Sequence, residues 1–191
     1  MFCLSKPSRN AVAKFISAQR SHELSYSGVG SSRERAPDGY IIDHNRIELG
    51  HGVETFQRAK RAVRQWKMFD MSWIVLCWPD TPIEPGACVA VLVSHLGFWS
   101  MNACRIVYAI DEQGPLDRFG FAYGTLPDHG ESGEERFTVE FNPNDQSVWY
   151  DLYAFSRPNP LARLAYPFTR ALQKRFAADS KTAMWKAAQS T

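Results

Sequence analysis

Three ionisable side chains, His44, Arg46 and Glu48, stand at alternate positions in the segment between Tyr40 and Gly52. If the segment is a β-strand, all of them point to one face, because successive side chains of a strand alternate. The row then belongs to a solvated edge strand, to a structural ion pair or to the wall of a polar cavity. In a cavity, Arg46 could orient a carboxylate or phosphate, and His44 could act as an acid or base near neutral pH.

Arg105 and Asp151 are charged residues inside segments that are otherwise largely apolar and strand-like. A buried charge is costly unless a partner compensates it. We therefore expect Arg105 and Asp151 to pair with each other across the sheet, or to face solvent. If the pair faced a cavity instead, it would be a polar anchor for a ligand.

Aromatic residues make up 13% of the chain, which favours a large core or an aromatic-lined pocket. Candidates for the lining of such a pocket are Tyr108, Phe121, Tyr123, Phe137, Phe141, Tyr150 and Leu152. Any core would use the same side chains, so both roles stay open. Small residues at Gly120, Ala122 and Gly124 alternate with aromatic ones, which predicts a bend or a close approach of another backbone.

The segment from Asp128 to Glu135 is acidic and contains His129. We expect a polar hairpin tip, with a loop that gates the mouth of a cavity as the alternative. The segment lacks the zinc patterns H-E-x-x-H and C-x-x-C and the calcium-loop pattern, so no metal site is predicted. The chain also has no dinucleotide loop, Walker loop or nucleophile elbow. We therefore expect no cofactor, and no sharp motif supports an enzyme.

The composition is that of an ordinary soluble globular domain: 45% of the 191 residues are hydrophobic and 22% are charged. The 4 cysteines lack C-x-x-C spacing, and we expect free thiols in a reducing compartment. No apolar run reaches the ~18 residues of a transmembrane helix. The N-terminus also lacks the apolar stretch of a signal peptide. These features predict a cytoplasmic protein.

Basic residues gather in the segments that are expected to be helices, although the net charge is only +2. A basic surface could dock on an anionic membrane or on nucleic acid, with steep salt dependence. That hypothesis requires one shared face for Arg58, Arg61, Arg64, Arg170, Lys174 and Lys181. Solvated helix faces are the alternative. We expect no nucleic-acid partner and leave peripheral membrane contact open.

Hydrophobic periodicity predicts an antiparallel sheet with helices. Residues 1–38 are expected to form an N-terminal helix and arm, and residues 39–191 the main domain. The first strand of that domain, 40–49, precedes an amphipathic helix that ends near Trp66. Strands joined by short turns follow up to Ser156, as in an antiparallel meander.

A long amphipathic helix is predicted at the C-terminal end. Asn159 is a suitable N-cap and Pro160 suits the first helical position. The apolar stripe continues to about Ala188, and Pro167 is expected to kink the helix near its first turns. The element order is then strand, helix, six strands and long helix, which places the helix across one face of a curved sheet.

Several segments resemble one protein family, domain of unknown function 1990, which occurs in bacteria and plants. The matching segments are 43–50, 97–108, 119–127, 129–137 and 148–158. The resemblance extends from about Leu4 to Lys186. That family looks like a member of the helix-grip superfamily, with birch-pollen-allergen-like, steroid-transfer-related and polyketide-cyclase-like proteins. The resemblance implies a small apolar or amphipathic molecule held between the sheet and the long helix.

We therefore expect an α+β protein with a helix-grip fold, in which a curved antiparallel sheet of about seven strands wraps on the C-terminal helix. The expected ligand-binding residues are His44, Arg46, Arg105, Tyr108, Phe121, Tyr123, Phe137, Tyr150 and Asp151. A cavity of ~300 Å³ or more is required for this function. A cyclase- or hydrolase-like enzyme that uses His44 with Arg46 or Arg105 is an alternative, and it requires His44 to face the cavity. The oligomeric state is left open.

Overall fold

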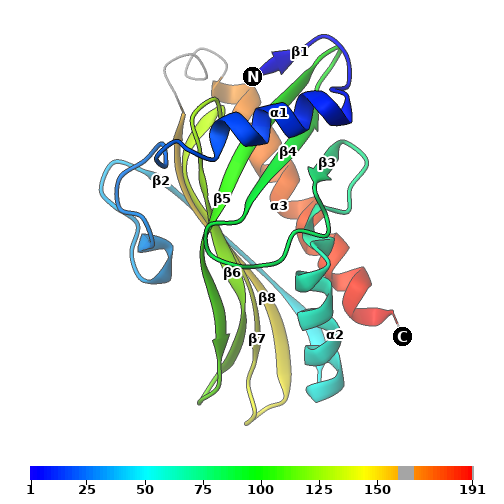
Figure 1. Cartoon of the computed structure of the whole chain (residues 1–191). Helices are drawn as coiled ribbons and strands as arrows, with labels where there is room; N and C mark the ends of the chain where they lie inside the picture. The colour runs from blue at the N-terminus through cyan, green and yellow to red at the C-terminus, as the bar shows by residue number, and fades with distance from the viewer. Residues whose placement is uncertain (159–165, 191) are drawn as a thin grey trace.

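A curved antiparallel sheet with helices packed on it forms the protein in the computed structural model, which describes residues 1–158 and 166–190 (Figure 1). The strands are β1 (Phe2–Cys3), β2 (Ile41–His51), β3 (Ile74–Cys77), β4 (Cys88–Ser94), β5 (Trp99–Glu112), β6 (Asp117–Thr125), β7 (Glu131–Phe141) and β8 (Ser147–Pro158). The helices are α1 (Arg9–Gln19), α2 (Val53–Arg64) and α3 (Tyr166–Gln189), with short 3-10 turns η1 (Ser31–Arg33) and η2 (Lys67–Phe69).

The sheet has the strand order β2-β8-β7-β6-β5-β4-β3, and β1 pairs with β5. All the pairings are antiparallel, as expected for strands that follow one another through short turns. β1 and β2 are the exceptions in sequence, because β1 pairs with β5 and β2 pairs with the last strand, β8. The predicted order of strand, helix, six strands and helix is confirmed, and the fold is a helix grip.

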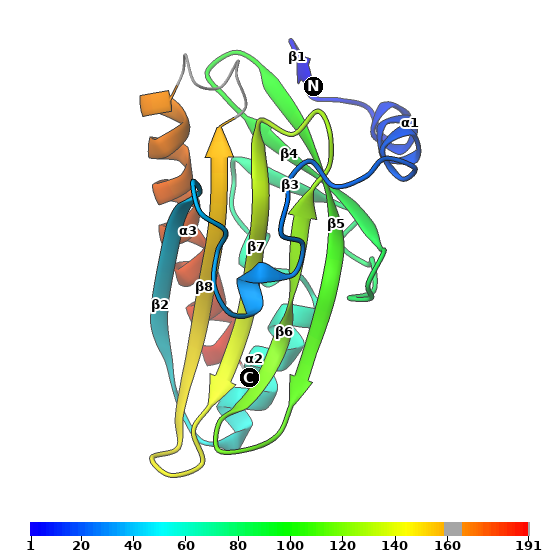
Figure 2. The same cartoon turned by 90° about the vertical axis from the view of Figure 1, so that its left-hand side faces the viewer.

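The sheet carries different partners on its two faces, as the views in Figures 1 and 2 show. Helices α2 and α3 cover one face, which we call the inner face, and α3 also contacts β2, β8 and η2. On the opposite face, which we call the outer face, the N-terminal arm crosses the sheet and η1 contacts β7 and β8. The predicted domain boundary at residue 38 stays a prediction.

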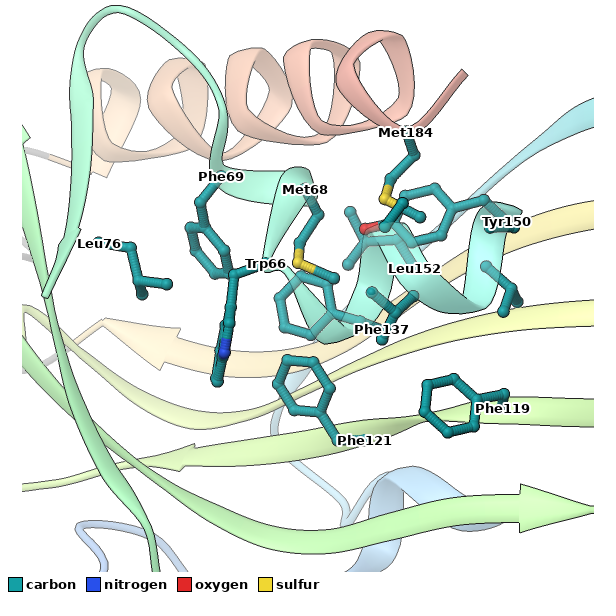
Figure 3. Close-up of a cluster of buried hydrophobic side chains, with 14 of the residues drawn as sticks. Trp66, Met68, Phe69, Leu76, Phe119, Phe121, Phe137, Tyr150, Leu152 and Met184 are labelled. Carbon is teal, nitrogen blue, oxygen red and sulfur yellow. The ribbon is translucent and has the colours of Figure 1, made fainter. Parts of the chain in front are cut away.

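Aromatic side chains fill the inner face beside α2. In β7, Phe137, Val139 and Phe141 all point inward, as their alternation in the sequence predicts. Trp66 packs on Phe121 with 4.6 Å between the ring centroids, so residues after α2 contact the middle of the sheet (Figure 3). Buried apolar area of this kind stabilises a fold by ~25 cal/mol per Å².

Both long helices follow their predicted patterns over the described residues. Phe56 and Val63 are buried on the sheet side of α2. α3 is continuous from its first described residue to Gln189, with Pro167 in its first described turn. The predicted start at Asn159 and Pro160 lies outside the described residues, so the kink expected at Pro167 stays a prediction.

The cysteines and the helix lengths complete this description. All the cysteines are free thiols, as predicted, and Cys77, Cys88 and Cys104 are buried. In residues 1–158 and 166–190, no helix combines the length and the apolarity that crossing a membrane requires.

Candidate functional site

A cavity of about 540 Å³ lies between the inner face of the sheet and the N-terminal half of α3. Strands β2 and β4 to β8 contribute to its wall, together with η2 and the residues around β3. The apolar part of the wall includes Phe69, Trp73, Val93, Leu152, Leu172 and Phe176. Because Leu172 and Phe176 come from α3, this helix forms one side of the cavity.

An aromatic cluster separates the cavity from the filled part of the core. Phe69 lies 5.5 Å from Phe137 and 5.5 Å from Phe176, measured between ring centroids. Phe137 is fully buried and does not line the cavity, whereas Phe69 and Phe176 do. Beyond this cluster, Tyr150 is fully buried and its hydroxyl lies 2.9 Å from that of Ser180 on α3. The cavity is therefore confined to one end of the sheet.

The predicted aromatic lining residues divide between these two regions. Tyr123 and Leu152 line the cavity. Phe121, Phe137 and Tyr150 lie in the filled core next to it, where Figure 3 shows them with Leu152. Their types alone did not separate the two roles, because the same large side chains suit a core and a pocket.

Polar side chains form one row across the sheet at the cavity. Asp43 of β2 and Glu135 of β7 both stand opposite Ala154 of β8, and Tyr123 of β6 stands opposite Glu135. All four residues line the cavity. The next row along the strands, from Phe121 through Phe137 to Leu152, is apolar. Of this apolar row only Leu152 reaches the cavity, so the polar row lies beside apolar wall residues such as Leu152, Leu172 and Phe176.

Glu135 is the central acidic group of this row. Its Oε2 accepts a hydrogen bond of 2.7 Å from the Tyr123 hydroxyl. The carboxyl group lies deep in the protein, yet part of the residue stays accessible because it borders the cavity. Burial raises the pKa of Glu135 to about 7; the Tyr123 hydrogen bond lowers it, and Glu131 and Asp43 raise it further.

Glu131, four residues before Glu135 on β7, and Asp43 have partners on α3. Gln173 donates to both carboxylate oxygens of Glu131, at 2.6 and 2.5 Å, and burial raises the pKa of Glu131. Arg170 forms a bidentate ion pair with Asp43, with 2.5 Å between Nη2 and Oδ1. These contacts tie α3 to the sheet beside the cavity.

His129 also lines the cavity, from the turn between β6 and β7. Its Nδ1 accepts a hydrogen bond of 3.0 Å from the backbone N–H of Glu131. Burial lowers the pKa of His129 to about 4, so the ring is neutral at pH 7. The predicted hairpin tip thus contributes wall residues to the cavity.

The row of His44, Arg46 and Glu48 lies on the outer face. Asp43 and Asn45 line the cavity, so the alternating residues of β2 point away from it. The prediction that the row shares one face is confirmed, and β2 is an edge strand of the sheet. The enzymatic hypothesis required an inward His44, so we abandon it.

Asp151 likewise lies on the outer face and forms ion pairs there. Its Oδ2 is 2.6 Å from Nε2 of His44, and its Oδ1 accepts a hydrogen bond of 2.9 Å from Arg136. The side chain of Asp151 is 5% exposed and that of His44 is 54% exposed. Arg46 pairs with Glu140 at 2.6 Å on the same face. These contacts are structural and do not reach the cavity.

The predicted pair between Arg105 and Asp151 is wrong. Arg105 donates hydrogen bonds of 2.8 Å to the backbone carbonyls of Arg20 and His22 in the N-terminal arm. Tyr108 also lies on the outer face, where its hydroxyl is 2.6 Å from the Ser32 hydroxyl. Both Arg105 and Tyr108 therefore form hydrogen bonds with the N-terminal arm, and neither lines the cavity.

Glu134 holds the arm on the outer face. Its carboxylate accepts hydrogen bonds from the hydroxyl of Tyr26 at 2.5 Å, from Gly30 N at 2.7 Å and from Ser32 N at 3.0 Å. The acidic segment thus divides by strand alternation: Glu131 and Glu135 point inward, whereas Glu134, which also borders the cavity, directs its carboxylate to the arm on the outer face. Because side chains alternate along a strand, an inward Phe137 also predicts an inward side chain for Glu135, two residues earlier.

The basic residues on the helices do not converge on one face. Arg58 donates to the carbonyl oxygen of Ala188 near the last turn of α3, at 2.6 Å. Arg170 instead pairs with Asp43 near the described beginning of α3. The condition for docking through a shared basic face is therefore not met.

A family model described as "Domain of unknown function (DUF1990)" matches residues 25–183 of the chain. A "UPF0548 protein" of Dictyostelium discoideum is 37% identical over 207 residues, which cover 98% of this chain and 95% of the relative. A "UPF0548 protein" of Deinococcus radiodurans is 38% identical, with 92% of each chain covered.

Two solved structures are similar to this chain at low sequence identity. The hypothetical protein jhp0584 from Helicobacter pylori gives a TM-score of 0.51 at 10% identity, with 83% of this chain and 93% of the other covered. Human STARD10 gives a TM-score of 0.46 at 11% identity, with 97% of this chain and 81% of the other covered. The first of these supports the fold, and neither likeness carries an activity.

Proposed function

The chain belongs to the family described as "Domain of unknown function (DUF1990)", and from this premise we propose that it binds a small, partly apolar molecule between the sheet and α3. The observation that carries the proposal is the cavity of about 540 Å³. Pockets that bind small molecules in proteins span ~300 to 1,000 Å³ and are mostly apolar with a few placed polar groups. The apolar wall residues beside the row of Asp43, Glu135 and Tyr123 match that description.

Small side chains support this proposal, because they keep the space between larger ones open. Ala154 on β8 and Ala177 on α3 both line the cavity. Protein interiors are normally close-packed, and wall atoms without a neighbour lose their dispersion contacts. A bound apolar group would restore those contacts and bury wall area at ~25 cal/mol per Å².

We also propose that the protein is cytoplasmic. Cys77, Cys88 and Cys104 are free thiols, which agrees with a reducing compartment. A ligand that dissolves poorly in water would give a cytoplasmic binding protein a physical reason to enclose it.

The proposal is tested by filling the cavity. Ala154→Phe adds an aromatic ring at the middle of the polar row, and Ala109→Phe is the matched control on an exposed position of β5. We expect the wild-type protein and the Ala109→Phe variant to bind the apolar fluorophore N-phenyl-1-naphthylamine with one site. Ala154→Phe should weaken that binding at least ~10-fold, which corresponds to ~1.4 kcal/mol.

Native mass spectrometry of the gently purified protein provides the second arm. A small molecule that co-purifies with the wild-type protein and is lost in Ala154→Phe would support the proposal. Equal fluorophore binding by both variants, with thermal unfolding showing both folded, would contradict a site in this cavity.

A further inference from the structure

We propose that the cavity takes a cationic amphiphile, an apolar body that carries a protonated amine, and that Glu135 holds the ammonium group. This inference rests on the proposed function and adds the charge of the ligand to it. It starts from an acidic side chain at the cavity, Glu135, of which one carboxylate oxygen has no hydrogen-bond partner among the described residues.

The first observation is an available acceptor. One oxygen of Glu135, Oε2, accepts from Tyr123, and the other, Oε1, accepts no hydrogen bond from any described residue. Glu135 lies deep in the protein and borders the cavity. Buried carboxylates normally have a charged or hydrogen-bonding partner, because desolvation without one is costly. A ligand in the cavity is the natural source of that partner.

The second observation is that the nearby cations have other partners. Arg170 forms a bidentate pair with Asp43. Lys181 lies 3.4 Å from the side-chain oxygen of Asn45, one inward position further along β2. Within residues 1–158 and 166–190, no basic side chain pairs with Glu135, and the charged groups that act on it are Glu131 and Asp43.

The third observation is the sign of the local field. Glu131 and Glu135 both border the cavity, and the neutral ring of His129 adds no positive charge at pH 7. The N-terminal ammonium of Met1 also borders the cavity, where it donates to the backbone carbonyls of Met101 and Asp128. An anionic head group would be repelled by both carboxyl groups, and a neutral one would leave an ionised Glu135 unpaired. An ammonium group carries three donors and a positive charge, so it would satisfy Oε1 directly.

The apolar part of the ligand has its own place in the cavity. The polar row lies on β2, β7 and β6, whereas Trp73, Val91 and Val93 form the wall at the β3 and β4 side of the sheet. Leu172 and Phe176 line the cavity on the side formed by α3. A molecule with its amine at Glu135 would therefore extend its apolar body toward β4, beneath α3.

Binding of such a cation is linked to the ionisation of Glu135. The groups that face this carboxyl are Tyr123 from β6, Glu131 from the same strand and Asp43 from β2. An alkyl ammonium stays protonated at neutral pH, as the lysine amine with a pKa of ~10.4 does. Affinity should therefore rise as the pH increases toward 7 and level off above it, because only ionised Glu135 forms the ion pair.

Calorimetric titration with three probes of equal chain length tests the inference: decylamine, decanol and decanoate, each below its micelle-forming concentration. The variants are Glu135→Gln and, as the matched control, Glu48→Gln on the outer face of β2. At pH 8, the wild-type protein should bind decylamine at least ~10-fold more tightly than decanol or decanoate. Glu135→Gln should remove that preference and keep the affinity for decanol, whereas Glu48→Gln should change neither.

The outcomes separate this inference from the proposed function. Equal or tighter binding of decanol or decanoate by the wild-type protein would overturn the cationic ligand and leave cavity binding in place. A preference for decylamine that survives in Glu135→Gln, or that weakens from pH 6 to pH 8, would also overturn it. If no probe binds and the fluorophore does not distinguish Ala154→Phe from Ala109→Phe, both proposals fail.

Discussion

Tyr123 and Glu135 stand opposite each other on neighbouring strands, and the tyrosine hydroxyl donates a 2.7 Å hydrogen bond to one oxygen of the carboxylate. Both side chains point to the inner face and line the cavity. The pairing directs the second oxygen of Glu135 away from Tyr123. A hydrogen bond between strands thus orients a buried acidic group whose ionisation responds to its surroundings near pH 7.

Tyr123→Phe removes this donor and keeps the ring. Because the Tyr123 hydrogen bond stabilises the ionised carboxylate and lowers its pKa, the variant should raise the pKa of Glu135 above its value of about 7. NMR titration of the carboxyl carbon measures this change. Tyr153→Phe, which alters a ring beside His44 on the outer face, is the control. A pKa that stays the same or falls in Tyr123→Phe would contradict the assigned hydrogen bond.

Glu135→Gln should stabilise the protein at pH 8 and have little effect at pH 4. The pKa of Glu135 is raised from 4.5 to about 7, so its contribution to stability is complete below 4.5 and is lost as the pH rises through 7. At 1.36 kcal/mol per pKa unit, the gain at pH 8 is at most about 3 kcal/mol. Urea unfolding at both pH values measures it, and Glu48→Gln provides the baseline. A variant that is less stable than the wild type at pH 8 would refute the account.

Glu134→Ala should release the N-terminal arm from the outer face of the sheet. The substitution leaves the buried donors of Tyr26, Gly30 and Ser32 without their acceptor. The expected loss in free energy of unfolding is on the order of 3 kcal/mol. Hydrogen exchange should show faster exchange at residues 26–36, with fluorophore binding kept. Tyr26→Phe, which removes a single donor, should cost about 1 kcal/mol. Unchanged protection of the arm in Glu134→Ala would contradict this role.

His44→Ala should not affect ligand binding. His44 pairs with Asp151 on the outer face, and Arg136 still pairs with Asp151 when the histidine is removed. The His44 side chain is half-exposed and Asp151 keeps Arg136 as a partner, so we expect a loss of at most ~1 kcal/mol in the free energy of unfolding. Fluorophore titration of the variant checks the prediction. A loss of affinity of ~10-fold or more would instead assign His44 a part in the site.

The sequence predicted the strands, helices and their order, because periodicity reports which side chains share a face. It placed His44, Arg46 and Glu48 together, as the structure confirms. It did not say whether Asp43 or His44 would turn inward, since a strand has the same alternation in both orientations. The packing of α3 on β2 decides this, and that contact joins residues more than a hundred positions apart.

The polar contacts of the site were harder to predict, because their partners come from distant segments. Arg105 bonds to carbonyl groups in the arm, and no pattern in the sequence marks a backbone oxygen as a partner. Glu135 and Glu134 are adjacent acidic residues with opposite roles. Their strand begins at Glu131, inside the segment that was expected to be a hairpin tip, so their alternation was not recognised.

Methyl NMR provides the most direct test of binding in the cavity. With isotopically labelled Ile, Leu and Val methyl groups, N-phenyl-1-naphthylamine is titrated into the wild-type protein. The account predicts shifts that saturate at one equivalent and are concentrated at Val93, Leu152 and Leu172, which line the cavity. Ile110, which clusters with Tyr108 on the outer face, should not shift. Saturating shifts at Ile110 with none at the cavity methyl groups would contradict the central claim.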